Sequence, residues 1–202
     1  DLTQQDASAG LKDALTQGAE VAVQELSAPG GFSNNPDVRI ELPGNLGKAS
    51  RSMKMMGMGG QITQLEDSMN KAAEAAVPQA QSLLVEAISK MSVQDAKSIL
   101  TGPADSATRY LETSSRDQIR ALFLPVVKDA TDQVGLAQQY NTFASQASSF
   151  GVMDAKDANI EGYVTERTLD GLFEMMAEQE ADIRSNPAEA ATSLAKKVFG
   201  SL

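Results

Sequence analysis

Apolar residues recur every three or four positions along most of the chain, the spacing that places side chains on one face of an α-helix. The pattern begins on a helix predicted over residues 8–26, whose apolar face consists of Leu11, Leu15, Ala19, Ala22 and Leu26. Further helices are predicted over residues 46–56, 61–77, 79–91, 92–102, 105–112, 115–134, 136–150, 159–184 and 187–199. Pro78 either kinks one long helix over residues 61–91 or opens the helix that follows it. We predict an all-α fold, a single domain over residues 1–202 with about eight helices.

Residues 28–47 interrupt this pattern with closely spaced Pro and Gly, which a helix does not tolerate. Inside the segment Val38, Ile40 and Leu42 alternate with Arg39 and Glu41, and a period of two is typical of extended backbone. We therefore expect an extended Pro/Gly-rich arm, either an edge strand or an arm laid over the helices.

Two helix starts carry recognisable capping residues. Ser92 followed by Asp95 forms a capping-box variant. Asn186, with Glu189 three residues later, predicts the start of the last helix, and Gly200 is expected just past its end.

Composition narrows the chemistry available to the chain. It has no His, Cys or Trp, which removes the imidazole base, the thiolate nucleophile and nitrogen or sulfur zinc ligands. We therefore expect a protein that is not an enzyme and that has neither a cofactor nor a metal site.

Charge and hydropathy limit the partners. A formal net charge of -10 is unfavourable for binding nucleic acid, which requires a basic surface. No apolar run approaches the roughly 18 residues of a membrane span, so no transmembrane span is expected.

One segment imitates a calcium-binding loop. Asp157, Asn159 and Glu161 supply oxygen atoms at the first, third and fifth positions, and Gly162 follows, but Thr168 stands where a bidentate Glu should close the loop. The alternative interpretation is that Asp157 or Asn159 caps a helix. That helix would have a core face made of Ile160, Val164, Leu172, Met176 and Ile183.

Residues 38–60 differ in charge from the rest of the chain, with a local net charge of +3. The cations are Arg39, Lys48, Arg51 and Lys54, and the last three lie at three-residue steps along one stripe of a predicted helix. This stripe is a candidate binding surface for an anionic lipid headgroup or an acidic partner protein. It is also suited to docking on the acidic helices of the same chain.

The same region concentrates thioether side chains, at Met53, Met55, Met56 and Met58. Such a cluster suits Cu(I), but Met is also an adaptable apolar residue that covers helix ends. We include the four Met with the cations as candidate binding residues for an apolar or anionic ligand.

Several strings resemble a family of small proteins from Gram-negative bacteria known as a domain of unknown function. The most specific are residues 91–102 (MSVQDAKSILTG) and 134–141 (VGLAQQYN). Residues 9–15, 42–46, 69–78 and 196–200 also match, so the resemblance extends over about residues 7–200. It implies an all-helical exported protein of the periplasm whose signal peptide has been removed, and it implies no catalytic activity.

The sequence thus predicts a periplasmic, non-enzymatic binding or interaction module, with a lipid or other apolar ligand held between helices. The alternative is an envelope structural or stress-associated protein that acts through protein partners. A chain that begins at Asp1 rather than Met suits either a chain trimmed at its start or a mature protein whose signal peptide has been removed.

Overall fold

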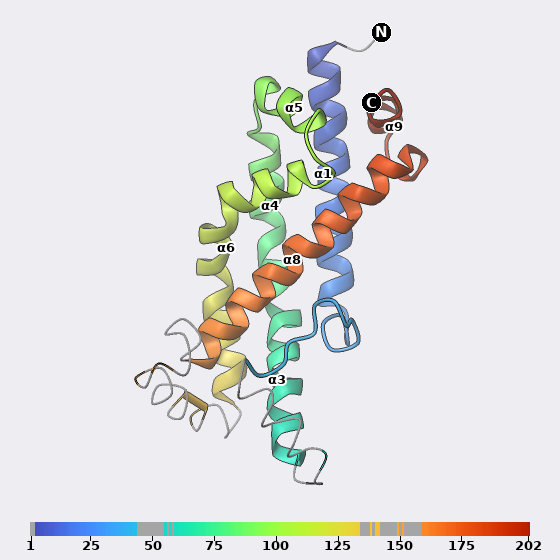
Figure 1. Ribbon diagram of the computed structural model, residues 1–202. Coiled ribbons are helices and arrows are strands. Elements are labelled where there is room, and N and C mark those ends of the chain that lie inside the picture. Colours follow the sequence, from blue (N-terminus) through green and yellow to red (C-terminus); the bar gives the residue numbers. More distant parts are fainter. Residues whose placement is uncertain are drawn as a thin grey trace. The chain divides into compact units, whose positions relative to one another are not determined.

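The computed structural model describes residues 3–43, 55, 57, 59–133, 138, 140–141, 149, 151 and 159–202. The regular elements of these residues are all helices, and no strand occurs among them (Figure 1). The α-helices are α1 (Gln4–Ser27), α3 (Gly60–Ala76), α4 (Gln81–Ser89), α5 (Val93–Leu100), α6 (Ser106–Asp132), α8 (Ile160–Ser185) and α9 (Ser193–Gly200). The predicted all-α class is confirmed for this part of the chain.

The predicted total of about eight helices stays a prediction, because the helices expected over residues 46–56 and 136–150 lie almost wholly outside the described residues. Pro78 lies in the 3₁₀ turn η1 (Val77–Ala80), which joins α3 to α4. A 3₁₀ turn suits this position, since proline has no N–H to continue the bonds of α3.

The prediction of two separate helices over residues 105–112 and 115–134 was wrong. These residues form the single helix α6, with Pro125 inside it. A proline at this position removes the N–H that would bond to the carbonyl of Ala121. Both Ala121 and Pro125 are exposed, so water can bond to that carbonyl and the helix continues.

The predicted start of the last helix was also wrong. Residues Pro187–Glu189 form the short 3₁₀ turn η3, and the Asn186 side chain makes no capping bond to the backbone there. Helix α9 begins later, where the Thr192 hydroxyl accepts a hydrogen bond of 3.1 Å from the Ala195 N–H. Gly200 is the last residue of α9 rather than the residue after it.

The capping box of α5 is confirmed. The Ser92 hydroxyl accepts from the Asp95 N–H at 3.0 Å, and the Asp95 carboxylate accepts from the Ser92 N–H at 3.3 Å. Hydrogen bonds from the Ser92 side chain, then from its backbone, then from the Tyr110 hydroxyl hold the pKa of Asp95 below its ordinary value. The pKa of Tyr110 is raised above its ordinary value, first by burial and then by its hydrogen bond to the negatively charged Asp95.

The chain divides into two compact units. The first comprises residues 1–25, 79–119 and 172–202, and the second comprises residues 26–78 and 120–171. The single domain expected from the sequence stays a prediction.

In the first unit, α1 and α9 approach each other very closely at Gly10. A Cβ atom at Gly10 would lie 2.4 Å from Cγ2 of Val198, so only glycine fits there.

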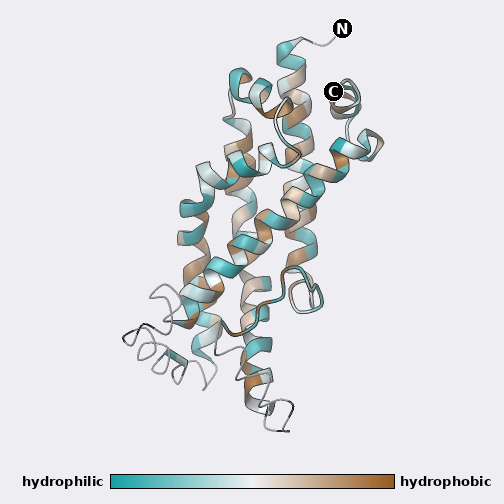
Figure 2. Ribbon diagram, in the orientation of Figure 1, coloured by the Kyte–Doolittle hydropathy of each residue, from teal (hydrophilic) through white to brown (hydrophobic). Residues whose placement is uncertain are grey.

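Brown apolar residues alternate with teal polar residues along the helices, as amphipathic helices require (Figure 2). Buried side chains of this unit include Leu11, Leu15, Ala19, Leu84, Ile88, Leu111, Phe173 and Val198.

The second unit contains α3, the first part of α8 and the described part of the arm. Its buried side chains include Leu26, Phe32, Val38, Ile40, Met69, Phe123, Ile160 and Val164. The core faces predicted for residues 8–26 and 159–184 are confirmed, because every residue named on them is buried.

Candidate functional site

Residues 28–43, called the arm from here on, form turns and irregular backbone and cross α3 (Figure 1). Gly30 has a φ of 81°, a conformation that glycine adopts without strain. The edge strand considered for Val38, Ile40 and Leu42 is not present, because helix α3 lies where a neighbouring strand would. Side chains of α3 replace the backbone groups that such a strand would offer.

Three polar residues of α3 bond to the arm, at positions four residues apart: Glu66, Asn70 and Glu74. This spacing places them in a row along one face of the helix. We call these three residues the α3 ladder. It was not predicted from the sequence.

Asn70, at the centre of the ladder, is fully buried. Its Oδ1 accepts from the Ile40 N–H at 2.9 Å, and its Nδ2 donates to the Ile40 carbonyl at 2.9 Å. One side chain thus satisfies both backbone groups of one residue, as a residue on a paired strand does. Nδ2 also donates to the Glu66 carbonyl at 2.8 Å, which fixes its orientation.

The two carboxylates of the ladder bond to further backbone N–H groups. Glu66, which is 2% exposed, accepts from the Leu42 N–H at 3.2 Å. Glu74 accepts from the N–H groups of Gly30 and Phe32 at 3.3 and 3.2 Å. All these bonds between the ladder and the arm involve the backbone of the arm.

Apolar side chains of the arm are buried beside the ladder. Phe32, Val38 and Ile40 are each at most 3% exposed. Gly171 of α8 makes this approach possible, since a Cβ there would lie 2.8 Å from Cε2 of Phe32 and 3.3 Å from Cβ of Val38. Tyr163 of α8 also donates from its hydroxyl to the Glu41 carbonyl.

The arm therefore covers a surface of α3 and α8, which we call the arm-binding surface. Its defining residues are Glu66, Asn70, Glu74, Tyr163 and Gly171. It combines apolar contacts with polar groups that bond to the backbone of the arm.

Most of the binding residues expected from the sequence cannot be placed. Lys48, Arg51, Lys54, Met53, Met56 and Met58 lie outside the described residues. Arg39 is half-buried and donates from Nη1 to the Ser33 carbonyl at 2.9 Å, a bond within the arm. Met55 is 88% exposed.

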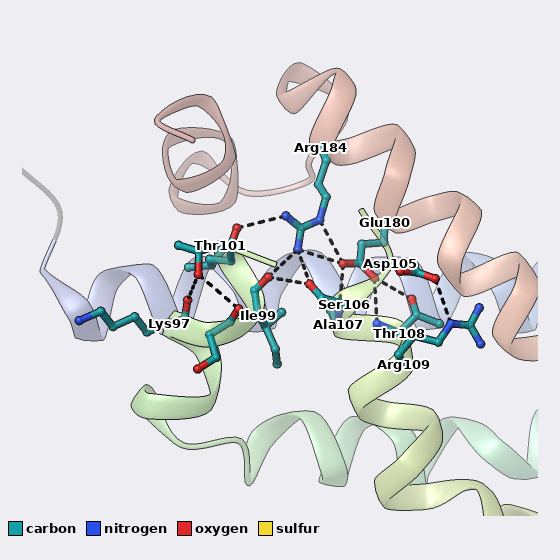
Figure 3. Close-up of polar contacts among 12 residues, drawn as sticks. Lys97, Ile99, Thr101, Asp105, Ser106, Ala107, Thr108, Arg109, Glu180 and Arg184 are labelled. Carbon is teal, nitrogen blue, oxygen red and sulfur yellow. Dashed lines mark hydrogen bonds and ion pairs between the residues drawn. The ribbon is translucent and has the colours of Figure 1, made fainter. Parts of the chain in front are cut away.

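The first unit contains a second candidate, a buried cluster of charged side chains on α8 (Figure 3). Glu180 is 5% exposed and accepts from the N–H groups of Ala107 and Thr108 at 3.0 and 2.8 Å. The Thr108 hydroxyl donates to the same carboxylate at 2.8 Å. Glu180 therefore caps the N-terminus of α6, where N–H groups have no partner within the helix.

Arg184, one turn further along α8, bonds to Glu180 and to the C-terminal end of α5, the helix that precedes α6. Its Nη2 donates to the Ile99 carbonyl at 3.0 Å and to the Ser106 hydroxyl at 3.1 Å, and its Nη1 donates to the Leu100 carbonyl. It therefore caps the C-terminus of α5. These contacts hold helix ends together, so the cluster has a structural role.

The helix cap considered as the alternative to a calcium loop is present at Asn159, while Asp157 lies outside the described residues. Asn159 accepts from the Gly162 N–H at 2.6 Å through Oδ1 and so caps α8. The Thr168 hydroxyl donates to the Val164 carbonyl at 2.7 Å inside the core, where it cannot face a cation. Within residues 3–43, 59–133 and 159–202, no three acidic side chains are grouped as metal ligands would be.

The ladder has a weak sequence signal, the string E-x3-N-x3-E from Glu66 to Glu74. On a surface helix such a row is a solvated face, so the spacing alone does not indicate burial. The additional signal was the arm itself, because extended backbone laid on a helix needs hydrogen-bond partners that the helix backbone cannot provide.

Comparison with known proteins gives a family without an assigned activity. The family model described as "Protein of unknown function (DUF4197)" matches residues 1–200. No curated protein and no solved structure matches the chain. Among the helices that the structure describes, none has the length and apolar character needed to cross a membrane.

Proposed function

Because the chain belongs to this family of unknown function, we propose its role from the arm-binding surface: it is a non-enzymatic binding module for an apolar ligand. The ligand occupies the arm-binding surface of α3 and α8 when the arm moves aside. The observation that carries the proposal is the burial of Phe32, Val38 and Ile40 beside Asn70, whose side chain bonds to both backbone groups of Ile40.

The arm is held by three buried apolar side chains and by hydrogen bonds from its backbone to α3 and α8. Three apolar side chains contribute about 1.5–3 kcal/mol each when fully buried, and each backbone hydrogen bond adds about 0.5–1.5 kcal/mol. Opening the arm alone leaves the hydrogen bonds within the helices intact, so we propose that it occurs as a local opening rather than through global unfolding.

The roles of the buried polar groups support a function other than catalysis. Glu180 and Arg184 bond to helix ends, and Glu66, Asn70 and Glu74 bond to the arm. These side chains hold backbone groups, and the chain has no His or Cys to act as base or nucleophile.

Export to the periplasm of a Gram-negative host is part of the proposal. It is supported by the resemblance of strings such as residues 91–102 to exported proteins. Mass spectrometry of the periplasmic fraction should find the processed chain there, and its recovery only from the cytoplasmic fraction would contradict this part of the proposal.

A disulfide between the arm and α8 tests the proposed function. The chain has no Cys, and the Cβ positions of Val38 and Gly171 are 3.3 Å apart, near the 3.5–4.5 Å typical of disulfides. In the double variant Val38→Cys/Gly171→Cys, the oxidised form should not bind an apolar fluorescent probe such as anilinonaphthalene sulfonate. The reduced form should bind it.

A glycine substitution provides the opposite test. Gly171→Ala places a methyl group 2.8 Å from Phe32 Cε2, so the arm should open more readily and bind the probe about tenfold more tightly. The matched control is Gly18→Ala, also in a helix, whose Cβ would make an ordinary contact of 3.4 Å.

The disulfide test has an outcome that would refute the proposed function. This outcome is equal probe binding by the oxidised and reduced forms of the double variant Val38→Cys/Gly171→Cys.

A further inference from the structure

The contacts between the arm and the α3 ladder identify what the arm-binding surface recognises. We infer that it is a docking site for a segment of a partner protein, which replaces the arm on α3 and α8 and is extended where it takes the place of residues 39–43. This inference rests on the proposed function, because it requires the arm to leave the surface.

The ladder distinguishes a peptide from a lipid. When the arm leaves, Asn70 Oδ1 loses the N–H of Ile40, and Glu74 loses the N–H groups of Gly30 and Phe32. An acyl chain has no N–H to replace them, and polar groups left without partners in an apolar surface are costly. A peptide backbone offers both N–H and C=O groups. A stretch without turns, as at residues 39–43, restores the bonds of Asn70, and a turn like that at residues 28–34 restores those of Glu74.

The arm also shows the pattern of side chains that the surface accepts. Val38 and Ile40 are buried, Arg39 between them is half-buried, and Glu41 is exposed. A partner segment should therefore have apolar residues at alternate positions and polar residues between them.

The bonded N–H groups further limit the partner. The ladder accepts from the N–H groups of residues 30, 32, 40 and 42, and the prolines of the arm lie elsewhere, at positions 29, 36 and 43. Since proline has no N–H, a partner segment should lack proline at the four equivalent positions.

The arm is tethered to the surface and so competes at an effective concentration in the millimolar range. A peptide added in solution should therefore bind poorly to the unmodified chain. Ile40→Ser weakens the arm by removing a fully buried apolar side chain, and it leaves every residue of the arm-binding surface unchanged.

The test uses a synthetic peptide with the sequence of residues 28–43 and the full-length Ile40→Ser chain. Titration calorimetry should give micromolar binding. A control peptide with N-methyl groups on the amides of its Ile40 and Leu42 keeps all side chains but loses two donors to the ladder. It should bind at least about tenfold more weakly.

A cross-link locates the peptide and remains informative if Ile40→Ser perturbs folding. A peptide carrying Cys in place of its Val38 should form a disulfide with a Gly171→Cys chain, and a peptide carrying Cys at its exposed Asp37 should do so much more slowly.

Three outcomes would overturn the inference. Equal binding of the two peptides would show that the ladder does not recognise backbone. Failure of both peptides to bind, while phosphatidylglycerol vesicles or the apolar probe still bind, would leave the proposed function standing with a lipid as the ligand. A dimer cross-linked between Val38→Cys of one copy and Gly171→Cys of another would make a second copy the occupant.

Discussion

Asn70 is the residue on which the attachment of the arm depends most. Replacing it by Leu keeps its approximate volume but removes both bonds to Ile40, whose N–H and C=O are then buried without that partner. We expect Asn70→Leu to lower the free energy of unfolding by about 2–4 kcal/mol and to speed amide exchange at Ile40. Urea unfolding and hydrogen exchange measure the two effects.

The control for this substitution lies on the same helix. Gln64 is exposed on α3, so Gln64→Leu should change stability by no more than about 0.5 kcal/mol. If the two variants unfold at the same urea concentration, the Asn70 amide does not support the arm.

At this scale the sequence predicted apolar positions better than polar ones. Leu11 and Leu15 were correctly placed in a core because apolar spacing directly indicates a buried face. Glu66 and Glu74 could not be placed, because a carboxylate on a helix is normally exposed. Glu66 is buried and Glu74 half-buried where they accept from backbone N–H groups of the arm, which lie between 24 and 44 residues away in sequence.

Helix α9 shows how a cap decides where an element begins. Thr192 accepts from the Ala195 N–H and also donates to Asp13 at 2.9 Å, whereas Asn186 caps nothing. Thr192→Ala should therefore cost about 1–2 kcal/mol, and Asn186→Ala no more than about 0.5 kcal/mol. Thermal unfolding of the two variants checks this, and the reverse order would restore the sequence-based start at Pro187.

The errors in element boundaries have a common cause. The pair Asn186 and Glu189 matches the local rule for a helix start, and Pro125 matches the local rule for a helix end. Whether the helix begins or ends there depends on tertiary contacts and on exposure to water. The chain at Ala190, which is buried, bends away from helical geometry, and the exposed side of α6 tolerates Pro125. Ser92 was predicted correctly because both partners of its capping box lie within four residues.

For the whole molecule, the class of fold followed from periodicity, which is a property of many residues and survives local errors. The candidate site did not follow from the sequence. The cations and methionines expected to form it lie largely outside the described residues. What the structure added is a surface assembled from α3, α8 and the arm, which no single stretch of sequence encodes.

The charge of the whole chain leads to the last prediction. With 27 acidic and 17 basic side chains, the chain has a formal net charge of -10 at pH 7, and a net charge far from zero destabilises a compact state through self-repulsion. Raising NaCl from 10 mM to 0.5 M shortens the screening length from about 30 Å to less than 10 Å and weakens this repulsion. Tm should therefore rise by about 2–4 °C, the change expected for about 1 kcal/mol in a chain of this length.

A variant of lower charge separates this effect from general effects of salt. Glu20, Glu25 and Asp67 are exposed, so their replacement by Gln, Gln and Asn removes three negative charges without disturbing the core. This variant should have a higher Tm than the parent at 10 mM NaCl and a smaller increase with salt. A Tm that falls with salt in both proteins would instead show that attractive pairs such as Arg120 with Glu166, 2.6 Å apart, outweigh the repulsion.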